Sequence, residues 1–271
     1  MSVITVSILI LGITGIIAAV VLYIVAKKFH VYENPDIARI EEILPGANCG
    51  ACGFSGCHAF AKACAEAKSL EDLQCPGAGQ EGMEQIAAIR GLTAGTLTRR
   101  VAIVGCNGAC AYRHEATHYD GVRSCAIEAG YYGGETPCVY GCLGCGDCVS
   151  VCPHDAIAMD DETHLPVVDF SKCVGCGKCA DACPHNVIEI ATLSDEHPLV
   201  YVACRNKDKG GIAIKECDVS CIGCGKCKRA CPVDNAVTVS EFLAHIDPAL
   251  CIGCEKCVEE CPRHSIHSLT V

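Results

Sequence analysis

CLGCGDCVSVCP, at residues 142–153, is the first of four copies of one cysteine signature in this chain. The other copies are CVGCGKCADACP at 173–184, CIGCGKCKRACP at 221–232 and CIGCEKCVEECP at 251–262. Each copy has the spacing Cys-x-x-Cys-x-x-Cys-x-x-x-Cys-Pro. Three closely spaced thiolates of this kind hold one [4Fe–4S] cluster, and the cysteine before the proline ligates a partner cluster. Four copies therefore predict two pairs of clusters and one-electron transfer.

Exchange of the last ligand between paired copies assigns the cysteines to four clusters. The first pair predicts the sets Cys142, Cys145, Cys148, Cys183 and Cys152, Cys173, Cys176, Cys179. The second pair predicts the sets Cys221, Cys224, Cys227, Cys261 and Cys231, Cys251, Cys254, Cys257. Disulfide bonds or zinc sites could also account for 27 cysteines in 271 residues. Disulfide frameworks belong to small secreted domains, and structural zinc needs two Cys-x-x-Cys pairs at each site. The repeated spacing favours iron–sulfur clusters over both.

A fifth [4Fe–4S] site is predicted in the segment NCGACGFSGCHAFAKACAEAKSLEDLQCPG at 48–77. Its glycine-rich loop allows backbone amides to approach cluster sulfurs, and these hydrogen bonds tune the potential. Cys64 shares a helical face with Phe60 and Ala61 and is expected to be a small buried apolar residue. A short amphipathic helix is predicted upstream, at 33–44. The ligands predicted for the fifth site are Cys49, Cys52, Cys57 and Cys75.

The amino-terminal segment from Ser2 to Ala26 contains no charged residue. A helix that crosses a bilayer needs about 20 apolar residues, so residues 1–28 are predicted to be a single transmembrane anchor. A signal peptide would carry basic residues before its apolar core, and none is present here. Lys27 and Lys28 follow the segment, and positive residues stay on the cytoplasmic side. The cluster domains are therefore expected on the cytoplasmic side of a bacterial inner membrane. The alternative is a buried helix of a soluble protein.

An internal repeat organises the carboxyl-terminal half of the chain. Each Cys-Pro of the four signatures is followed by a segment that predicts a turn and a short strand. The fold class is therefore predicted as α+β, with metal clusters in place of much of a conventional core. A helix (Glu84–Arg90) and a strand (Val101–Val104) are predicted upstream. The predicted parts are an N-terminal [4Fe–4S] domain at 29–80, a linker with a cysteine-rich insert at 81–120, and two tandem 2[4Fe–4S] ferredoxin modules at 121–195 and 196–271. Adding 79 to the numbers of Cys125, Cys138, Cys142, Cys145, Cys148 and Cys152 gives Cys204, Cys217, Cys221, Cys224, Cys227 and Cys231.

Four cysteines upstream of the first module are enough for a sixth [4Fe–4S] cluster. They are Cys106, Cys110, Cys125 and Cys138. Because Cys125 and Cys138 have the repeat equivalents Cys204 and Cys217, the second copy could be a remnant of this site, or none of these thiols binds metal. Cys110, His114 and His118 also have the i, i+4, i+8 spacing of one helical face, which could form the edge of a zinc site.

The order of these parts resembles the B subunit of the Rnf complex, the ion-translocating ferredoxin:NAD oxidoreductase of bacterial membranes. The resemblance covers essentially the whole chain and rests on NCGACGFSGC at 48–57, CVYGCLGCGDC at 138–148 and CDVSCIGCGKCKRACP at 217–232. Shorter family members have one ferredoxin module instead of two. The resemblance implies an electron-carrying subunit of a translocase, with soluble ferredoxin, flavin-containing subunits and the membrane as partners.

Several functions are not supported by any motif. No dinucleotide-binding fingerprint and no Walker A sequence occur, because every Gly-x-Gly here is a spacer between cysteines. No catalytic residue, nucleotide site or nucleic-acid partner is therefore expected on this chain. One alternative is a membrane-anchored wiring subunit of a hydrogenase or formate dehydrogenase. Another is a regulatory cluster protein that senses oxygen, although sensors seldom need six centres in series.

A basic stretch interrupts an acidic chain of net charge −11. Between Arg205 and Arg229, seven basic residues face three acidic ones, which leaves a local charge of +4. Lys226, Lys228 and Arg229 flank predicted cluster ligands. A positive patch beside a cluster could steer an acidic ferredoxin, and the alternative is a solvated surface without a partner.

Overall fold

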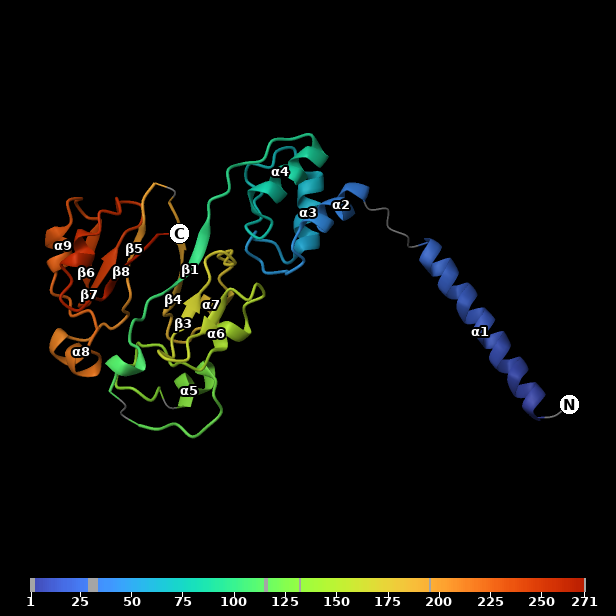
Figure 1. Cartoon of the computed structure of the whole chain (residues 1–271). Helices are drawn as coiled ribbons and strands as arrows, with labels where there is room; N and C mark the ends of the chain where they lie inside the picture. The colour runs from blue at the N-terminus through green and yellow to red at the C-terminus, as the bar shows by residue number, and fades with distance from the viewer. Residues whose placement is uncertain (1–2, 29–33, 115–116, 132, 195, 271) are drawn as a thin grey trace.

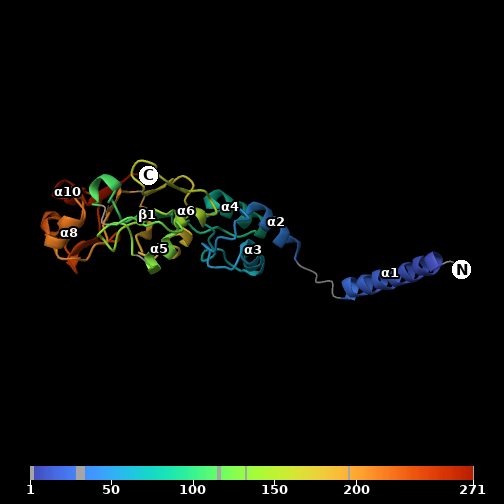
Figure 2. The ribbon, with the colours of Figure 1, turned by 90° about the horizontal axis from the view of Figure 1, so that it is seen from below.

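The computed structural model describes residues 3–28, 34–114, 117–131, 133–194 and 196–270. Helix α1 (Val3–Lys28) lies apart from all other elements in both views of the ribbon (Figure 1, Figure 2). The large apolar side chains between Leu9 and Val25 are 46% to 72% exposed. Ser2 belongs to the predicted anchor but lies outside the described residues.

Within the described part of the chain, no helix meets the length and apolarity that a membrane span requires. The predicted single transmembrane helix is therefore not supported by the structure.

The first folded unit is a cluster of three helices with a conventional apolar core. Asn34 caps the first of them, because its side-chain oxygen accepts a hydrogen bond of 3.0 Å from the backbone N–H of Asp36. Phe60, Leu70 and Ile86 are completely buried in the core. The helices are α2 (Pro35–Ile43), α3 (Cys57–Glu66) and α4 (Gly79–Arg90).

Helix α4 differs in place and length from the helix predicted inside a linker. It begins at Gly79 and packs Met83, Ile86 and Ala87 into the core of α2 and α3. The apolar face of this helix needs a partner surface, and the preceding helices provide it. The core therefore extends beyond residue 80, the end of the predicted N-terminal domain.

The first ferredoxin-like unit contains two antiparallel strand pairs and two short helices. Strand β1 pairs with β4 from Val104↔Ile188 to Arg100↔Thr192, and β2 pairs with β3. The predicted strands after the first two Cys-Pro pairs are confirmed as β2 and β4. The elements are β1 (Arg100–Val104), β2 (Ile157–Met159), β3 (Pro166–Val168), β4 (Ile188–Thr192), α6 (Asp147–Ser150) and α7 (Lys178–Asp181).

The second unit repeats this plan. Strand β5 pairs with β8, and β6 pairs with β7, again antiparallel. The elements are β5 (Leu199–Val202), β6 (Val237–Ser240), β7 (Leu243–Ile246), β8 (Ile266–Leu269), α8 (Gly210–Glu216), α9 (Lys226–Ala230) and α10 (Lys256–Glu259). Two short helices, η1 (Cys110–Tyr112) and α5 (Cys125–Tyr131), lie in the insert of the first unit.

Strand β1 belongs to the first unit although the sequence placed it in the linker. Its partner β4 is the last strand of that unit, as β8 is the last strand and partner of β5 in the second. The hydrogen bonds agree, because Gly105 N–H donates to Val187 and Ala203 N–H donates to Ser265, just after β1 and β5. Each unit therefore begins with a strand that closes its outer pair.

Candidate iron–sulfur centres

The N-terminal site is built around the start of α3. Cys57 is the first residue of this helix, and its N–H donates to the Asn48 side-chain oxygen at 2.8 Å. Burial raises the pKa of the Cys75 thiol, while backbone N–H groups of Ala78 and Gly77 hydrogen-bond to it and the thiols of Cys52 and Cys49 add a like charge. The structure thus brings Cys75 near the loop cysteines. We call this set (Cys49, Cys52, Cys57, Cys75) site N.

Cys64 is a core residue of the N-terminal helices and is not counted among the ligands of site N. It is completely buried on α3, as predicted. Burial raises its pKa to about 12, and the nearby thiols of Cys75 and Cys52 raise it further, whereas no backbone N–H contributes. A buried thiol that receives no amide is a small apolar residue of the core.

Four predicted ligands of the first unit line one cavity, which we call site 1B (Cys152, Cys173, Cys176, Cys179). Ala102 N–H, on β1, donates to the Cys173 sulfur at 3.3 Å. Ala156 N–H donates to the Cys152 sulfur at 3.4 Å. Hydrogen bonds from backbone N–H groups to ligand sulfurs are usual around an iron–sulfur cluster.

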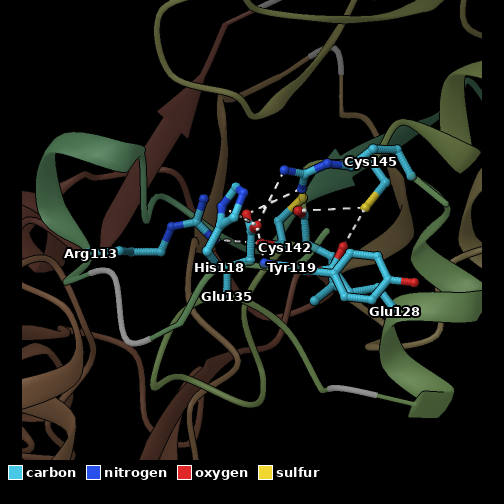
Figure 3. A network of polar contacts seen from close by, with 9 residues as sticks. Arg113, His118, Tyr119, Glu128, Glu135, Cys142 and Cys145 are labelled. Atoms are coloured by element: carbon cyan, nitrogen blue, oxygen red, sulfur yellow. Dashed lines mark hydrogen bonds and ion pairs between the residues drawn. The ribbon is translucent and has the colours of Figure 1, made fainter. Parts of the chain in front are cut away.

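The neighbouring cavity contains three of the four ligands predicted for its cluster, Cys142, Cys148 and Cys183, together with Cys125. The fourth predicted ligand, Cys145, donates to the Glu128 carboxylate at 2.9 Å instead (Figure 3). Burial, then this hydrogen bond, raises the pKa of the Cys145 thiol. We call the predicted set Cys142, Cys145, Cys148 and Cys183 site 1A.

The insert is held on this unit by polar contacts, which Figure 3 shows around site 1A. Arg113 donates to the carbonyl of Cys142. Glu135 accepts a hydrogen bond of 2.8 Å from Tyr119 N–H and pairs with Arg123 at 3.2 Å. These contacts lower the pKa of Glu135, the amide of Tyr119 most of all.

The second unit repeats both sites. The four ligands predicted for site 2A (Cys221, Cys224, Cys227, Cys261) line one cavity. In site 2B (Cys231, Cys251, Cys254, Cys257), Gly253 N–H donates to the Cys251 sulfur at 3.4 Å. Burial and then the thiols of Cys251 and Cys227 raise the pKa of Cys257 to about 11.

The four thiols predicted for a sixth cluster are not brought together. A further cavity, which we call the junction cavity, is lined by Cys106 and Cys138 and also by Cys204 and Cys217. Cys110 lies exposed on η1, and Cys125 lines the cavity of site 1A. The sequence interpretation missed Cys204 and Cys217 as members of a cavity, although the repeat by 79 residues had singled them out.

No single-ion site is found among the side chains that the structure describes: no three or more of His, Cys, Asp and Glu are arranged around one metal position. His118, part of the predicted zinc edge, lies 3.6 Å from Glu135. All-thiol donor sets are typical of soft metal centres such as iron–sulfur clusters. The cysteines of sites 1B and 2A, with cavities between them and amides on their sulfurs, fit such a group.

Successive sites are neighbours along the molecule. Among the causes that raise the pKa of Cys176 after burial, the thiol of Cys49 links site N to site 1B. For Cys148, the thiol of Cys179 links site 1A to site 1B. The thiol of Cys227 likewise raises the pKa of Cys257, which links sites 2A and 2B. The junction cavity is lined by Gly141, next to Cys142 of site 1A, and by Ser220, next to Cys221 of site 2A.

A hydrogen bond connects each of sites 1A and 2A to a cysteine of the junction cavity. Cys142 N–H, in site 1A, donates to the sulfur of Cys106 at 3.5 Å. Cys221 N–H, in site 2A, donates to the sulfur of Cys204 at 3.3 Å. These contacts place the described thiol sites in series from the N-terminal helices to the second unit.

Family models agree with the observed units. A 4Fe-4S dicluster domain matches residues 141–187 and 220–265, and a putative Fe-S cluster domain matches residues 44–76. These matches cover sites N, 1A, 1B, 2A and 2B.

Three curated relatives, all B subunits of ion-translocating complexes, resemble the chain over most of its length. The relative from the Na(+)-translocating ferredoxin:NAD(+) oxidoreductase complex of Acetobacterium woodii is 41% identical over 88% of this chain and 70% of its own length. The relative from the proton-translocating ferredoxin:NAD(+) oxidoreductase complex of Clostridium ljungdahlii is 41% identical over 89% of this chain and 83% of its own. The relative from the ion-translocating oxidoreductase complex of Methanosarcina acetivorans is 38% identical over 89% of both chains.

Proposed function

The chain belongs to the family of B subunits of ion-translocating ferredoxin:NAD(+) oxidoreductase complexes, and we propose that it relays electrons between ferredoxin and the flavin-containing subunits that serve NAD. The observation that carries this proposal is the series of neighbouring thiol sites from site N to site 2B. A relay needs its centres in succession, and a sensor needs only one.

Sites N, 1A, 1B, 2A and 2B would each hold one [4Fe–4S] cluster through the four cysteines of their names. Such a cluster supplies reversible one-electron transfer when it is bound. The residues of the chain do the rest. The cysteines would hold the clusters as thiolates, and the amides of Ala102, Ala156 and Gly253, which donate to ligand sulfurs, would stabilise their negative charge. Glu128 is completely buried and accepts a hydrogen bond from the Cys145 thiol.

Purification of the intact complex under anaerobic conditions tests the function. We expect the chain to co-purify with flavin-containing subunits and its iron to be reduced by reduced ferredoxin. Co-purification with a nickel or molybdenum subunit would instead support the wiring subunit of a hydrogenase or formate dehydrogenase. The relatives differ in the ion that their names give, sodium or proton, so neither ion is assigned to this chain.

The proposal includes a single-pass anchor at the amino terminus, with the cluster domains on the cytoplasmic side of the cell membrane. The charge-free sequence before Lys27 and Lys28 supports it, as do the exposed apolar side chains of α1. A chain that starts at Lys28 should stay in solution and retain its iron. If this shortened chain still sediments with protein-free lipid vesicles, residues 1–28 are not the sole anchor.

The proposal also places the ferredoxin dock beside site 2A. Arg205 is paired with Glu189 at 2.6 Å and Lys207 with Glu241 at 2.7 Å. Lys226, Lys228 and Arg229 are exposed on α9 instead, and Arg229 donates to the carbonyl of the ligand Cys224 at 3.3 Å. A positive surface this close to a ligand would attract an acidic carrier and shorten the transfer path.

Charge reversal separates this dock from a solvated surface. The triple change of Lys226, Lys228 and Arg229 to Glu should slow ferredoxin oxidation several-fold at low salt, and the difference should close as salt screens the field. The matched control reverses Arg39, Lys62 and Lys68, which are exposed on the N-terminal helices. Slowing by the control triple alone would move the dock to site N.

A further inference from the structure

The junction cavity has the size of a cluster site. Its free volume, open solvent included, is about 340 Å³, and the cavities at sites 1A, 1B and 2A measure about 360, 360 and 340 Å³ in the same terms. Cys138, Cys204 and Cys217 are buried, and Cys106 is half-buried. Four thiols thus surround a space like those of the predicted ferredoxin sites.

The four thiols come from equivalent places in the two ferredoxin-like units. Cys106 follows the end of β1 by two residues, and Cys204 follows the end of β5 by two residues. Each of these sulfurs accepts the N–H of the first cysteine of its own unit, Cys142 or Cys221. The cavity is therefore a pseudo-twofold site in which each unit supplies one strand-end cysteine.

The second cysteine of each unit is equivalent as well. Cys138 and Cys217 each stand four residues before the first cysteine of the Cys-Pro signature. Backbone N–H groups of Tyr140 and Val219, two residues further on, hydrogen-bond to their sulfurs. The same i+2 amide contact occurs at Cys176 with Lys178, in site 1B. The sulfurs of Cys138 and Cys217 therefore receive the same backbone hydrogen bond as a predicted cluster ligand.

Two half-buried arginines face this space. Arg113 and Arg205 line the cavity. Among the described residues, the Nε atom of each is buried without a hydrogen-bond partner. A cubane held by four thiolates is an anion overall, and these two guanidinium groups would offset part of its charge, although Arg205 also pairs with Glu189 at 2.6 Å. Asn206, also buried, directs its amide N–H to the Cys138 sulfur at 3.5 Å.

We propose that Cys106, Cys138, Cys204 and Cys217 hold a further [4Fe–4S] cluster at the junction of the two ferredoxin-like units. This site replaces the set Cys106, Cys110, Cys125 and Cys138 that the sequence predicted. Its place between sites 1A and 2A makes it the connection between the two halves of the series. Its existence does not depend on the partners named for the proposed function, because iron binding is measured on the chain itself.

Iron content of the full chain tests the ligand set. Cys204→Ala and Cys217→Ala should each lower the iron of anaerobically purified protein by about four atoms per chain. Cys110→Ala and Cys64→Ala are the matched controls and should leave it at the wild-type value. Wild-type iron in both Cys204→Ala and Cys217→Ala, or a loss of four iron atoms in Cys110→Ala, would overturn the assignment.

A second variant keeps the test decisive if a missing ligand unfolds the chain. Asn206→Leu keeps all four thiols and removes the hydrogen bond to the Cys138 sulfur, together with the bonds that the side chain makes with Glu216 and with the N–H of Asp208. Hydrogen bonds to the sulfurs stabilise the more negative, reduced cluster. We therefore expect full iron content and one redox centre with a lower midpoint potential in an anaerobic titration followed by electron paramagnetic resonance. Full iron content with every centre at its wild-type potential would contradict the proposed site.

Discussion

The core of the N-terminal helices and the core of the second ferredoxin-like unit are built from different kinds of side chain. The core of α2, α3 and α4 contains large apolar side chains, among them Ile40, Phe60 and Leu70. The core of the second unit is made of aliphatic residues such as Val200, Val237 and Ala244, and a third of its buried members are cysteines. Its strands have only four residues each.

This difference indicates where the folding free energy of each part comes from. Burial of a large apolar side chain contributes roughly 1.5–3 kcal/mol, so the N-terminal helices gain stability without metal. A unit whose core contains so many thiols and so few large side chains must obtain much of its folding free energy from ligand–metal bonds. Removal of iron should therefore produce a larger difference in stability between the two parts than any substitution does.

Removal of iron is the strongest test. With an iron chelator and a mild oxidant, amides of β5 to β8 should lose essentially all protection from hydrogen exchange, because their core is held by the clusters. Amides of α2 and α4 should keep most of theirs. Hydrogen exchange with mass spectrometry on the full chain measures both, and equal loss in both parts would show that site N also holds the helices together.

A substitution in the apolar core should give the opposite pattern. Phe60 is completely buried and contacts Phe54 edge to face, with ring centroids 5.5 Å apart. Phe60→Ala should destabilise the N-terminal helices by about 3–5 kcal/mol and leave the iron of sites 2A and 2B in place. Phe242→Ala, at a side chain that is 47% exposed, is the control and should change little. Iron loss from the second unit on changing Phe60 would contradict the separation.

Most of the fold could be predicted because cysteine spacing restricts the chain so strongly. The signature predicted the four thiols that line each of the cavities at sites 1B and 2A, and the strands after each Cys-Pro were placed correctly as β2, β4, β6 and β8. The amphipathic helix at 33–44 is confirmed as α2. Local sequence carried these predictions, since each depends on contacts within one short repeat.

The parts that differ depend on contacts between distant segments. The pairing of β1 with β4 joins residues that are far apart in sequence, and no local pattern shows it. The repeat by 79 residues aligned Cys125 with Cys204, but the strand pairs align Cys106 with Cys204. The longer insert of the first unit, which contains Cys110 and Cys125, hid this equivalence.

Backbone geometry gives a smaller contrast between the two parts. Gly223, in site 2A, has φ +62°, and a Cβ there would lie 2.7 Å from the carbonyl oxygen of Phe242. Gly91 has φ +64° at the end of α4, where a Cβ would have open space. Gly223→Ala should cost roughly 2–4 kcal/mol, and Gly91→Ala about 1 kcal/mol. Thermal unfolding of the iron-loaded chain compares them, and equal costs would mean that Phe242 moves away freely.

The smallest contrast concerns polar contacts at the surface of each part. The Asn34 side chain accepts the N–H of Asp36 at the start of α2, where the amides have no partner within the helix. Asn34→Ala should therefore cost about 1 kcal/mol, seen as faster hydrogen exchange in the first turn of α2. Lys207 and Glu241 form an exposed pair in the second unit, and Lys207→Ala should have a smaller effect than Asn34→Ala because water and salt screen the pair. Since the pair touches no ligand sulfur in the described structure, iron content should be unchanged in both variants. A larger effect from Lys207 than from Asn34 would show that the second unit depends on its surface charges as well as on its metal.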